Sequence, residues 1–557
     1  MDKIRIVNLG GQDEDYNGLT VVEINNDIFV IECGMRFPDK TKPGVDLIIP
    51  RYDYLIENKS KIRAYFITHG HDACFGALPF IYEKAPAPIY CTGVTRSVIK
   101  GFCKHFNKDF TKLNIVLVNA SDDLLICNRK ISLFQVATNH ADSYSLSIST
   151  DQGDIVYASN FIISQDNIKG FNFDNQKIAQ VCLNKTLVLL TDSYNANIPG
   201  YCSPHHKLLP IIRRKIYTVD GRVFLGIDSP DLFNICSIIN LAVRLNKKII
   251  LYDENAKNVF DALNENGYLK LNRDSVASIE DVNRLKPTDV FVLITGYGEK
   301  LNSKVALLAT KSNDEKIVFL TKQDTFIFTP HVLPENEVST TEAIDELFKT
   351  GCKVVTTSKK EFLRMHACEE DIKTFISIFQ PKYFVPVTGT FSKLLAAANI
   401  AVSANVGLNH NNVFIVDNGQ FIEFEAGIGK ISNAKAITGD VLVDGKGIGD
   451  IKPAVLEERQ RLSDEGAIVL GVTISKSKHE IVAGPDVQAR GLVFLKDNES
   501  LIKEITRLFV TTVNNEIVKE NYSIKYIEEA TKDIVFKAIR RSINKTPTII
   551  PIISEIN

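Results

Sequence analysis

The chain has 557 residues, of which 45% are hydrophobic and 24% are charged, and its 65 Lys and Arg residues nearly balance 67 Asp and Glu residues, for a formal net charge of -2. This composition excludes a mainly disordered chain and a uniformly basic coat for nucleic acid, so any contact with a polyanion would use a local patch. The length predicts about three or four domains or lobes.

The ten cysteines are scattered and include no Cys-x-x-Cys pair. Disulfide frameworks are typical of small secreted proteins, and zinc ribbons need closely spaced cysteine pairs. The N-terminus lacks the apolar run of a signal peptide, and no apolar stretch is long enough to span a bilayer. We therefore expect free thiols, a soluble cytoplasmic protein and no association with membranes.

Short apolar runs that are typical of buried strands recur along the chain. The predicted strands are Ile28–Ile31, Ala64–Thr68, Leu187–Thr191, Val223–Ile227, Lys248–Tyr252, Val290–Thr295, Ile317–Thr321 and Tyr383–Val387. Between them, apolar residues at a helical spacing predict a helix over Asp231–Leu245. Strands that alternate with helices favour a layered α/β architecture.

Glycine and proline indicate where the chain divides. Pro199 and Gly200 follow a predicted strand, and a new α/β segment begins near Gly221. A glycine-rich stretch between Gly427 and Gly449 precedes a final segment that we predict to be a small, separate α+β domain.

The segment AYFITHGHDACFGALP, at residues 64–79, carries the clearest chemical signal. A predicted strand ends in a loop that offers His69 and His71, and alternate residues of an extended loop can turn toward one ion. Neutral imidazole is a good ligand for Zn²⁺. An isolated pair of this kind is equally consistent with a polar surface loop, but the preceding strand and the following Gly-Ala-Leu-Pro favour a metal site.

In this wording the segment resembles the metal-binding turn of the metallo-β-lactamase fold, and specifically that of the ribonuclease J family. Further similar segments follow in the family's order: GVDLIIP at 44–50, LLTDSYNANIPG at 189–200, TGYGE at 295–299, PKYFVPVTG at 381–389, and VAGPDVQARGLVF in the tail. The resemblance therefore covers nearly the whole chain.

The resemblance implies an α/β fold: a metallo-β-lactamase αββα sandwich, an inserted β-CASP α/β lobe and a small α+β C-terminal domain. The implied boundaries are 1–200 and 369–430 for the two parts of the sandwich, 201–368 for the β-CASP lobe, 431–450 for a linker and 451–557 for the C-terminal domain.

The family cleaves RNA from its 5′ end, and sometimes internally, with two zinc ions that activate a water and hold the attacking and leaving oxygens. Its motif His-x-His-x-Asp-His reads here with Ala73 and Cys74 at the last two positions. The bridging aspartate is Asn160, and the final histidine is Thr388. The resemblance thus implies that most ligands of the second ion are missing.

The first ion would keep His69 and His71. The family's third histidine falls on Thr138 without a gap, and His140 can take its place only if the loop is remodelled. We therefore expect at most one weakly bound zinc ion, on His69, His71 and either His140 or Cys74, or no zinc. A one-residue shift that brings in Asp72 is less favoured.

The family's phosphate-binding segments have changed as well. The family's His-Val-Ser-Gly-His motif corresponds here to FLRMH at residues 362–366, in which only the final histidine, His366, is kept. Arg364 is a candidate phosphate contact, and the bulky Met365 takes the position of glycine. A second segment, IDSPDLFN at 227–234, gains a proline and an acidic residue. Asp192 keeps the family's acidic position, where it either takes part in the site or caps a turn.

Near the C-terminus, basic and apolar residues alternate in a pattern that predicts an amphipathic helix: Lys532, Lys537, Arg540, Arg541 and Lys545, with Ile534, Val535, Ala538 and Ile539 between them. A solvated helix that packs on its own domain is the simpler interpretation, and an oligomer contact or a surface for RNA is the alternative.

These features favour a catalytically weak or inactive accessory subunit that binds RNA, associates with an active ribonuclease J paralogue, and forms homo- or hetero-oligomers such as dimers or tetramers. The alternatives are a slow zinc-dependent ribonuclease with a remodelled single-metal site, and an RNA-binding scaffold with no nuclease partner.

Overall fold

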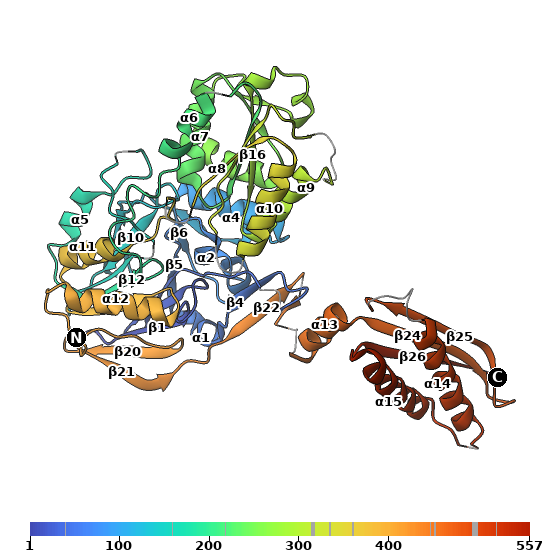
Figure 1. The fold of residues 1–557 in the computed structure, drawn as a ribbon. Coiled ribbons are helices and arrows are strands. Elements are labelled where there is room, and N and C mark those ends of the chain that lie inside the picture. The colour runs from blue at the N-terminus through green and yellow to red at the C-terminus, as the bar shows by residue number, and fades with distance from the viewer. Residues whose placement is uncertain are drawn as a thin grey trace. The chain divides into compact units, whose positions relative to one another are not determined.

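The computed structural model describes the whole chain except residues 39–40, 159, 167, 218, 313–317, 333–335, 359–360, 446, 450–452, 493–498 and 520. The chain divides into two compact units (Figure 1). Unit 1 comprises Met1–Arg36 and Ile48–Val441, and unit 2 comprises Phe37–Leu47 and Leu442–Asn557.

Unit 1 contains two sheets that pack face to face. The eight-stranded sheet has the order β21 (Ile428–Lys435), β20 (Gln420–Glu425), β1 (Ile4–Gly10), β2 (Leu19–Ile24), β3 (Asp27–Ile31), β5 (Ile62–Phe66), β6 (Ile89–Cys91) and β7 (Ile115–Leu117). The six-stranded sheet has the order β19 (Tyr383–Val387), β12 (Thr186–Asp192), β11 (Asp154–Ala158), β10 (Tyr144–Ile148), β9 (Arg129–Gln135) and β8 (Asp123–Ile126). Phe29 and Phe66 of one sheet share a core with Leu133 and Tyr157 of the other, which confirms the predicted sandwich.

Helices cover the sandwich. Helices α11 (Glu369–Phe379) and α12 (Phe391–Ser403) pack against β12 and β19, and α4 (Gly93–His105) packs beside β7. The shorter elements of this part are β4 (Leu47–Pro50), α1 (Asp53–Glu57), α2 (Asp72–Phe75), α3 (Leu78–Ile81), α5 (Asn175–Val181), and the 3₁₀ turns η1 (Lys59–Lys61) and η2 (Phe110–Lys112).

Unit 1 also contains an all-parallel sheet with helices on both faces. Its order is β15 (Val276–Ala277), β14 (Lys248–Leu251), β16 (Val290–Gly296), β13 (Val223–Asp228), β17 (Thr325–Phe328) and β18 (Lys353–Thr356). One face packs against α7 (Leu232–Arg244) and α8 (Glu254–Glu265), and the other against α9 (Glu299–Ala309) and α10 (Glu337–Lys349). Helix α6 (Leu209–Tyr217) and the turns η3 (Ile279–Asp281) and η4 (Pro287–Asp289) complete this lobe.

Most predicted elements are confirmed, including the helix now seen as α7, but two strands differ from the prediction. The strand β5 ends at Phe66 rather than Thr68, because Glu32 adopts a φ of 63° and turns its partner β3 away. The strand predicted at 317–321 is wrong for residues 318–321, and Ile317 lies outside the described residues. There the Thr321 backbone N–H donates to Asp324 and forms a turn, and the paired strand begins at Thr325.

Unit 2 has a three-stranded sheet whose order is β25 (Glu480–Arg490), β24 (Ala467–Ser475) and β26 (Thr548–Ile556). Apolar residues of β24 share a core with α14 (Glu499–Ile517) and α15 (Ile524–Ile543). The other elements are β22 (Asp440–Asp444), β23 (Gly447–Ile448) and α13 (Pro453–Glu465). The predicted basic helix is therefore confirmed as α15, and its apolar Val535 and Ile539 are buried on this sheet.

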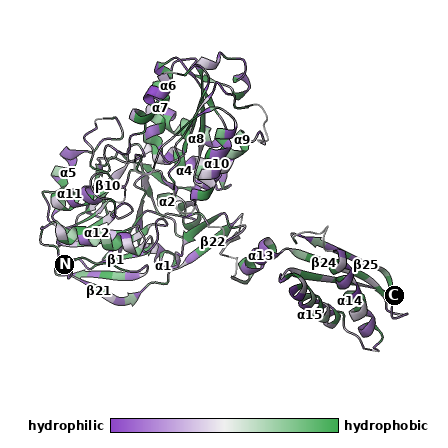
Figure 2. Ribbon diagram, in the orientation of Figure 1, coloured by the Kyte–Doolittle hydropathy of each residue, from purple (hydrophilic) through white to green (hydrophobic). Residues whose placement is uncertain are grey.

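Hydrophobic residues dominate the strands of unit 1, whereas the helices carry both hydrophobic and hydrophilic residues along their length (Figure 2). None of the helices in the described ranges combines the length and the apolar composition needed to cross a membrane.

Gly34, just after β3, lies against α2. A Cβ atom at this position would lie 1.8 Å from the Ala73 carbonyl oxygen and 2.7 Å from the Gly18 nitrogen. We expect Gly34→Ala to lower the free energy of unfolding by about 2–3 kcal/mol, because the added methyl displaces backbone. Urea denaturation measures this change.

The matched control is Gly101→Ala, within α4, where the nearest atoms to an added Cβ lie 3.6 Å away on the Asn258 side chain. This change should preserve stability or raise it by up to about 1 kcal/mol, because alanine favours a helix over glycine. Equal losses in both variants would contradict the steric argument.

Candidate functional site

The candidate site lies where strand ends from both sheets of the sandwich meet. His69 follows β5, Asp192 ends β12 and Thr388 follows β19. The Thr68 carbonyl accepts from the Tyr144 backbone N–H at 3.1 Å, and the Thr388 carbonyl accepts from the Ser193 N–H at 3.3 Å. Backbone hydrogen bonds therefore hold these strand ends together, and the loops that follow them carry the candidate residues.

Three histidines form a cluster at this edge. The ring centroid of His69 lies 5.5 Å from that of His140 and 6.3 Å from that of His71, and the centroids of His71 and His140 are 5.9 Å apart. Three imidazoles on one tetrahedral zinc ion would have centroids roughly 5 Å apart, given Zn–N bonds of about 2.0–2.1 Å. The cluster is thus slightly wider than a formed site.

His140 reaches this cluster through a compact turn. The Thr138 hydroxyl accepts from the His140 backbone N–H at 2.9 Å and lies 2.7 Å from the Ser143 hydroxyl. Thr138 therefore closes the loop instead of serving as a ligand, and this turn brings His140 next to His69. Neither ring nitrogen of His140 has a hydrogen-bond partner among the described residues.

The histidines of the cluster are neutral. Burial lowers the pKa of His69 and of His71 well below the ordinary value, and burial lowers the pKa of His140 to about 3. Neutral imidazole is the form that binds a metal ion. The three neutral rings can therefore bind a metal ion, whereas burial disfavours their protonation.

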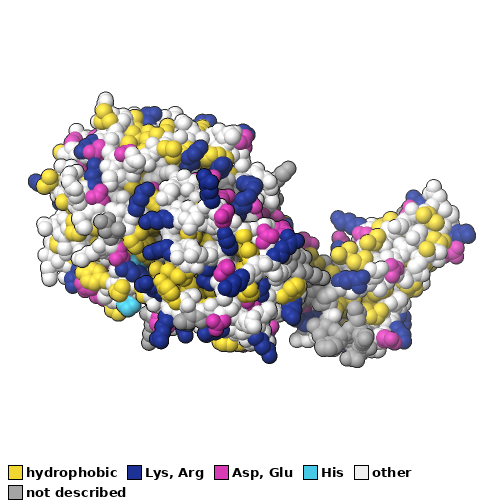
Figure 3. Space-filling model, turned by 90° about the horizontal axis from the view of Figure 1, so that it is seen from above, with side chains coloured by type: hydrophobic (Ala, Val, Ile, Leu, Met, Phe, Trp, Pro, Cys, Tyr) yellow, Lys and Arg dark blue, Asp and Glu magenta, His cyan; other side chains and the backbone are white. Residues whose placement is uncertain are grey.

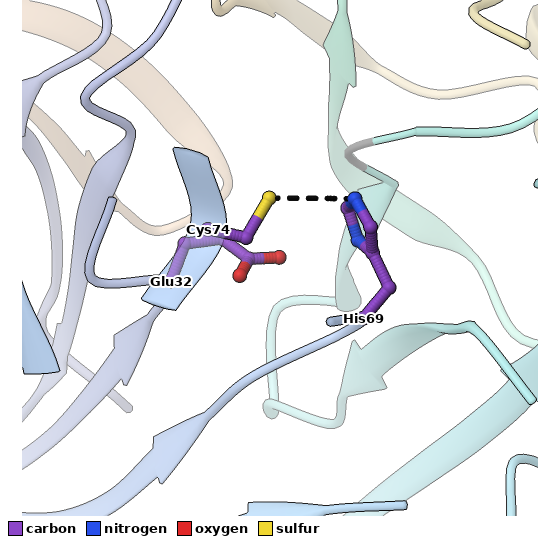
Figure 4. Close-up of side chains that lie close together, drawn as sticks. All are labelled: Glu32, His69 and Cys74. Carbon is purple, nitrogen blue, oxygen red and sulfur yellow. Dashed lines mark hydrogen bonds between the residues drawn. The ribbon is translucent and has the colours of Figure 1, made fainter. Parts of the chain in front are cut away.

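Cys74 and Glu32 lie beside His69 (Figure 4). The Cys74 Sγ atom is 3.5 Å from His69 Nε2, and ligand atoms of Glu32, His69 and Cys74 all lie within 4.8 Å of one another. The Thr68 hydroxyl donates to the Glu32 carboxylate and lies 2.8 Å from His69 Nδ1. Sequence reasoning missed Glu32, since a single acidic residue at a strand end has no distinguishing spacing.

The family resemblance implies ligands of a second ion at three positions, and the side chains there offer no carboxylate or imidazole. Ala73 presents a methyl group, Asn160 a neutral amide, and Thr388 a hydroxyl. None of these groups supplies the negative charge or the strong donor that a second dication needs. The side chains at this edge therefore fit one metal ion and do not fit two.

Arg364 lies at the centre of a group of tyrosines. Its Nη1 atom donates to the Tyr16 hydroxyl at 2.7 Å and to the Tyr297 hydroxyl at 3.4 Å, and the Tyr194 hydroxyl is 3.5 Å away. The Tyr297 hydroxyl in turn donates to that of Tyr16 at 2.9 Å. The guanidinium predicted to contact phosphate is thus already engaged by three phenols.

Two histidine–aspartate pairs flank Arg364. His366 Nδ1 lies 2.7 Å from Asp192, and His331 Nδ1 lies 2.9 Å from Asp228. The Asp192 carboxylate also accepts from the Tyr194 backbone N–H at 3.3 Å, so it orients His366 and caps a turn at the same time. Sequence reasoning named His366 and Asp192 separately, and the fold brings them together.

The N-terminus of α7 is closed to anions. The Asp231 carboxylate accepts from the Asn234 backbone N–H at 3.2 Å and thereby caps the helix. Burial raises the pKa of Asp231. The acidic residue that this segment gains therefore occupies the place where a helix N-terminus would otherwise attract phosphate.

The cavity between His71 and Arg364 is small. It is lined by His71, Arg364, His331 and His366 among others, and it leaves about 20 Å³ for the centre of a water-sized sphere, which is room for about one water molecule. A second cavity, which Arg364 lines together with Tyr194, His331 and Phe362, leaves about 140 Å³ by the same measure. Sequence reasoning missed Tyr16 and Tyr297, because single tyrosines in loops after strands carry no periodic signal.

Comparison with known proteins shows which families share these features. The ribonuclease J β-CASP domain matches residues 220–347, and the ribonuclease J C-terminal domain matches residues 454–556. Ribonuclease J 2 of Staphylococcus aureus (strain NCTC 8325 / PS 47) is 30% identical over 554 residues, which cover 99% of this chain and 98% of that protein.

Ribonuclease J 2 of Staphylococcus saprophyticus subsp. saprophyticus is 29% identical over 553 residues, again covering 99% of this chain and 98% of the relative. The crystal structure of a protein of unknown function from Enterococcus faecalis V583 matches with a TM-score of 0.51 at 13% identity, over 76% of this chain and 100% of that chain. At this identity the match shows a shared fold alone.

The buried, neutral histidines predict a loss of stability in acid. Below about pH 6.5 the unfolded chain protonates these residues and the folded chain does not, so the free energy of unfolding falls as the pH is lowered. We expect His140→Gln to reduce this slope by up to about 1.4 kcal/mol per pH unit, measured by urea denaturation of chelator-treated protein between pH 4.5 and pH 6.5, a window of roughly two units below the unfolded pKa.

The control is His105→Gln, because His105 is exposed at the end of α4. Its slope should equal that of the unmodified protein. An unchanged slope in His140→Gln would show that His140 takes up its proton in the folded state.

Proposed function

The chain belongs to the ribonuclease J family, and from that premise we propose that it is an RNA-binding accessory subunit with weak or no ribonuclease activity of its own. Family membership supports a role in RNA processing. The proposal concerns how this particular chain performs that role.

The observation that carries the proposal is the loss of donors for a second ion at Ala73, Asn160 and Thr388. Hydrolysis by two metal ions requires both, because one generates the nucleophile while the pair stabilises the attacking and leaving oxygens. With a methyl, an amide and a hydroxyl at these positions, the chain's own residues can position water or phosphate but cannot neutralise the developing charge.

The proposed contact with RNA uses local basic patches. On the face shown in Figure 3, Lys and Arg side chains are spread widely with Asp and Glu among them, in keeping with the net charge of -2. The Arg364 side chain is already hydrogen-bonded to tyrosine hydroxyls, so we propose that the main RNA contact lies outside the small cavity beside Arg364. Arg364 and His366 would reach phosphate only after this cluster opens.

The proposed partner is a ribonuclease J paralogue with intact metal ligands, in a homo- or hetero-oligomer such as a dimer or tetramer. A subunit that catalyses no reaction can still stabilise its partner and extend the path for RNA.

We also propose the domain boundaries 1–200, 201–368, 369–430, 431–450 and 451–557. Residues 431–450, assigned to the linker, include most of β21 and all of β22 and β23. None of the ten cysteines forms a disulfide bond, which suits the reducing cytoplasm.

The second candidate is a slow ribonuclease that uses one metal ion. The grouping of His69, His140 and Cys74 favours it, since these donors suit a single zinc ion. Such an enzyme would need an open coordination position for water, which distinguishes it from the accessory subunit.

The nuclease test compares the unmodified chain with a quadruple variant, Ala73→Asp, Cys74→His, Asn160→Asp and Thr388→His, on RNA that carries a 5′-monophosphate. We expect little or no cleavage and at most one equivalent of bound zinc for the unmodified chain. The four changes should act only together, because ligands of one centre act as a unit. Two equivalents of zinc with efficient cleavage by the unmodified chain would overturn the proposal.

The assembly test uses the full chain and a variant that lacks 451–557, each co-expressed with a tagged, active ribonuclease J from the same genome. We expect the full chain to co-purify with the partner and the deletion variant to lose this association while unit 1 stays folded by circular dichroism. Failure of the full chain to associate would refute the accessory role. Retention of the shortened chain would place the interface outside residues 451–557.

A further inference from the structure

Glu32, His69 and Cys74 come from three segments and meet in the core of unit 1. Glu32 follows β3, His69 follows β5, and Cys74 lies in α2. Their exposed fractions are 2%, 1% and 8%, respectively. A carboxylate, an imidazole and a thiol thus share a site that is shielded from water, where binding to a common cation would stabilise each of these buried groups.

The spacing of sulfur and nitrogen fits one metal ion. The distance from Cys74 Sγ to His69 Nε2 is 3.5 Å. A tetrahedral zinc ion with a Zn–S bond of about 2.3 Å and a Zn–N bond of about 2.0 Å holds these two atoms about 3.5 Å apart. With the Glu32 oxygen, all three ligand atoms lie within 4.8 Å of one another.

The hydrogen bonds around His69 leave the correct nitrogen available. The Thr68 hydroxyl donates its hydrogen to Glu32 and therefore accepts from His69 Nδ1, which must carry the ring proton. The lone pair of neutral His69 then lies on Nε2, which faces Cys74. Metal-binding histidines are typically fixed by such a bond from the other ring nitrogen.

The ring proton of His71 lies on the other nitrogen from that of His69. The His71 Nδ1 atom accepts a hydrogen bond from the Ala73 backbone N–H at 3.0 Å and caps α2, so the proton of the neutral ring lies on Nε2. His71 would have to give up this cap to bind a metal through Nδ1. His140 lies outside the group of ligand atoms within 4.8 Å, but its ring centroid is 5.5 Å from that of His69 and its nitrogens lack partners in the described part of the chain. A movement of this ring toward Cys74 and His69 would therefore supply a fourth ligand.

We infer that this chain binds one zinc-type divalent ion through Cys74, His69 and Glu32, with His140 as the fourth ligand and without His71. The inference rests on the proposed function, because it applies to a chain without a two-metal hydrolytic centre. A thiolate and a carboxylate together neutralise the dication, and four protein ligands leave no position for water. Such a closed site ties β3, β5 and α2 together and serves stability rather than catalysis.

The test is cobalt substitution in the full-length protein. Metal-free protein is titrated with Co²⁺, and thiolate ligation gives a charge-transfer absorption in the near ultraviolet. We expect this absorption to saturate at one equivalent and to disappear in Cys74→Ser. Cys103→Ser is the control, because Cys103 is also a buried thiol and lies in α4, and it should keep the full absorption.

Two further variants distinguish the ligand sets. Glu32→Gln should weaken Co²⁺ binding by about 10–100-fold while the thiolate absorption persists, whereas His71→Gln should leave the affinity within a factor of about two, since loss of the cap alters α2 but no ligand. Weaker binding in His71→Gln than in Glu32→Gln would overturn the inference, as would an absorption that survives Cys74→Ser.

X-ray absorption at the zinc edge tests the unmodified protein and needs no variant. We expect one sulfur at about 2.3 Å and nitrogen or oxygen ligands at about 2.0 Å; a spectrum with nitrogen and oxygen alone would refute thiolate ligation. The two proposals fail separately. If the chain binds its nuclease partner but no zinc, only the metal site is refuted. If it has this metal site and cleaves RNA efficiently, only the accessory role is refuted.

Discussion

The packing of the two sheets of unit 1 against each other is the constraint on which the site depends. Side chains such as Phe66 and Tyr157 fill the space between the sheets, and this core fixes the separation and angle of the strands. Because β5, β12 and β19 end at the same edge, the residues after them must meet whatever their chemistry. The fold thus retains a site even where individual ligands have changed.

The replacements at this edge balance one another electrostatically. A two-metal centre needs acidic ligands to offset four positive charges, and this chain has Asn160 and Thr388 where the family resemblance implies a bridging carboxylate and an imidazole. Removing such donors leaves no buried charge unpaired if the ions leave too. Beside them, the Arg364 charge is solvated by three phenols and lies 3.9 Å from Asp228. The charge of Arg364 is therefore compensated by protein groups even when no phosphate is bound.

Glu32 connects these two aspects of the molecule. Its φ of 63° ends the pairing of β3 with β5, and its carboxylate orients His69 through Thr68. One residue thereby sets both the length of a strand and the tautomer of the first histidine. Cys74, which is a soft donor in place of an imidazole, then faces the nitrogen that this arrangement leaves free.

The sequence alone determined the layered α/β architecture and the place of the site, because strand patterns and the His69–His71 spacing are local signals. It also showed that Ala73, Asn160 and Thr388 carry no carboxylate or imidazole, since the absence of a donor can be recognised without geometry. Helix α7 could be predicted closely because its apolar periodicity and its Asp231 cap lie within one short segment.

Only the tertiary structure decided which residues act together. Asp192 and His366 are 174 positions apart, and Arg364 and Tyr16 are 348 positions apart, so no spacing in the sequence could pair them. The choice between Thr138 and His140 depended on a turn closed by Ser143, and the place of Glu32 depended on two strands meeting a helix. Hydrogen-bond partners are set by where backbones converge, and that convergence is a property of the packed sheets rather than of any local pattern.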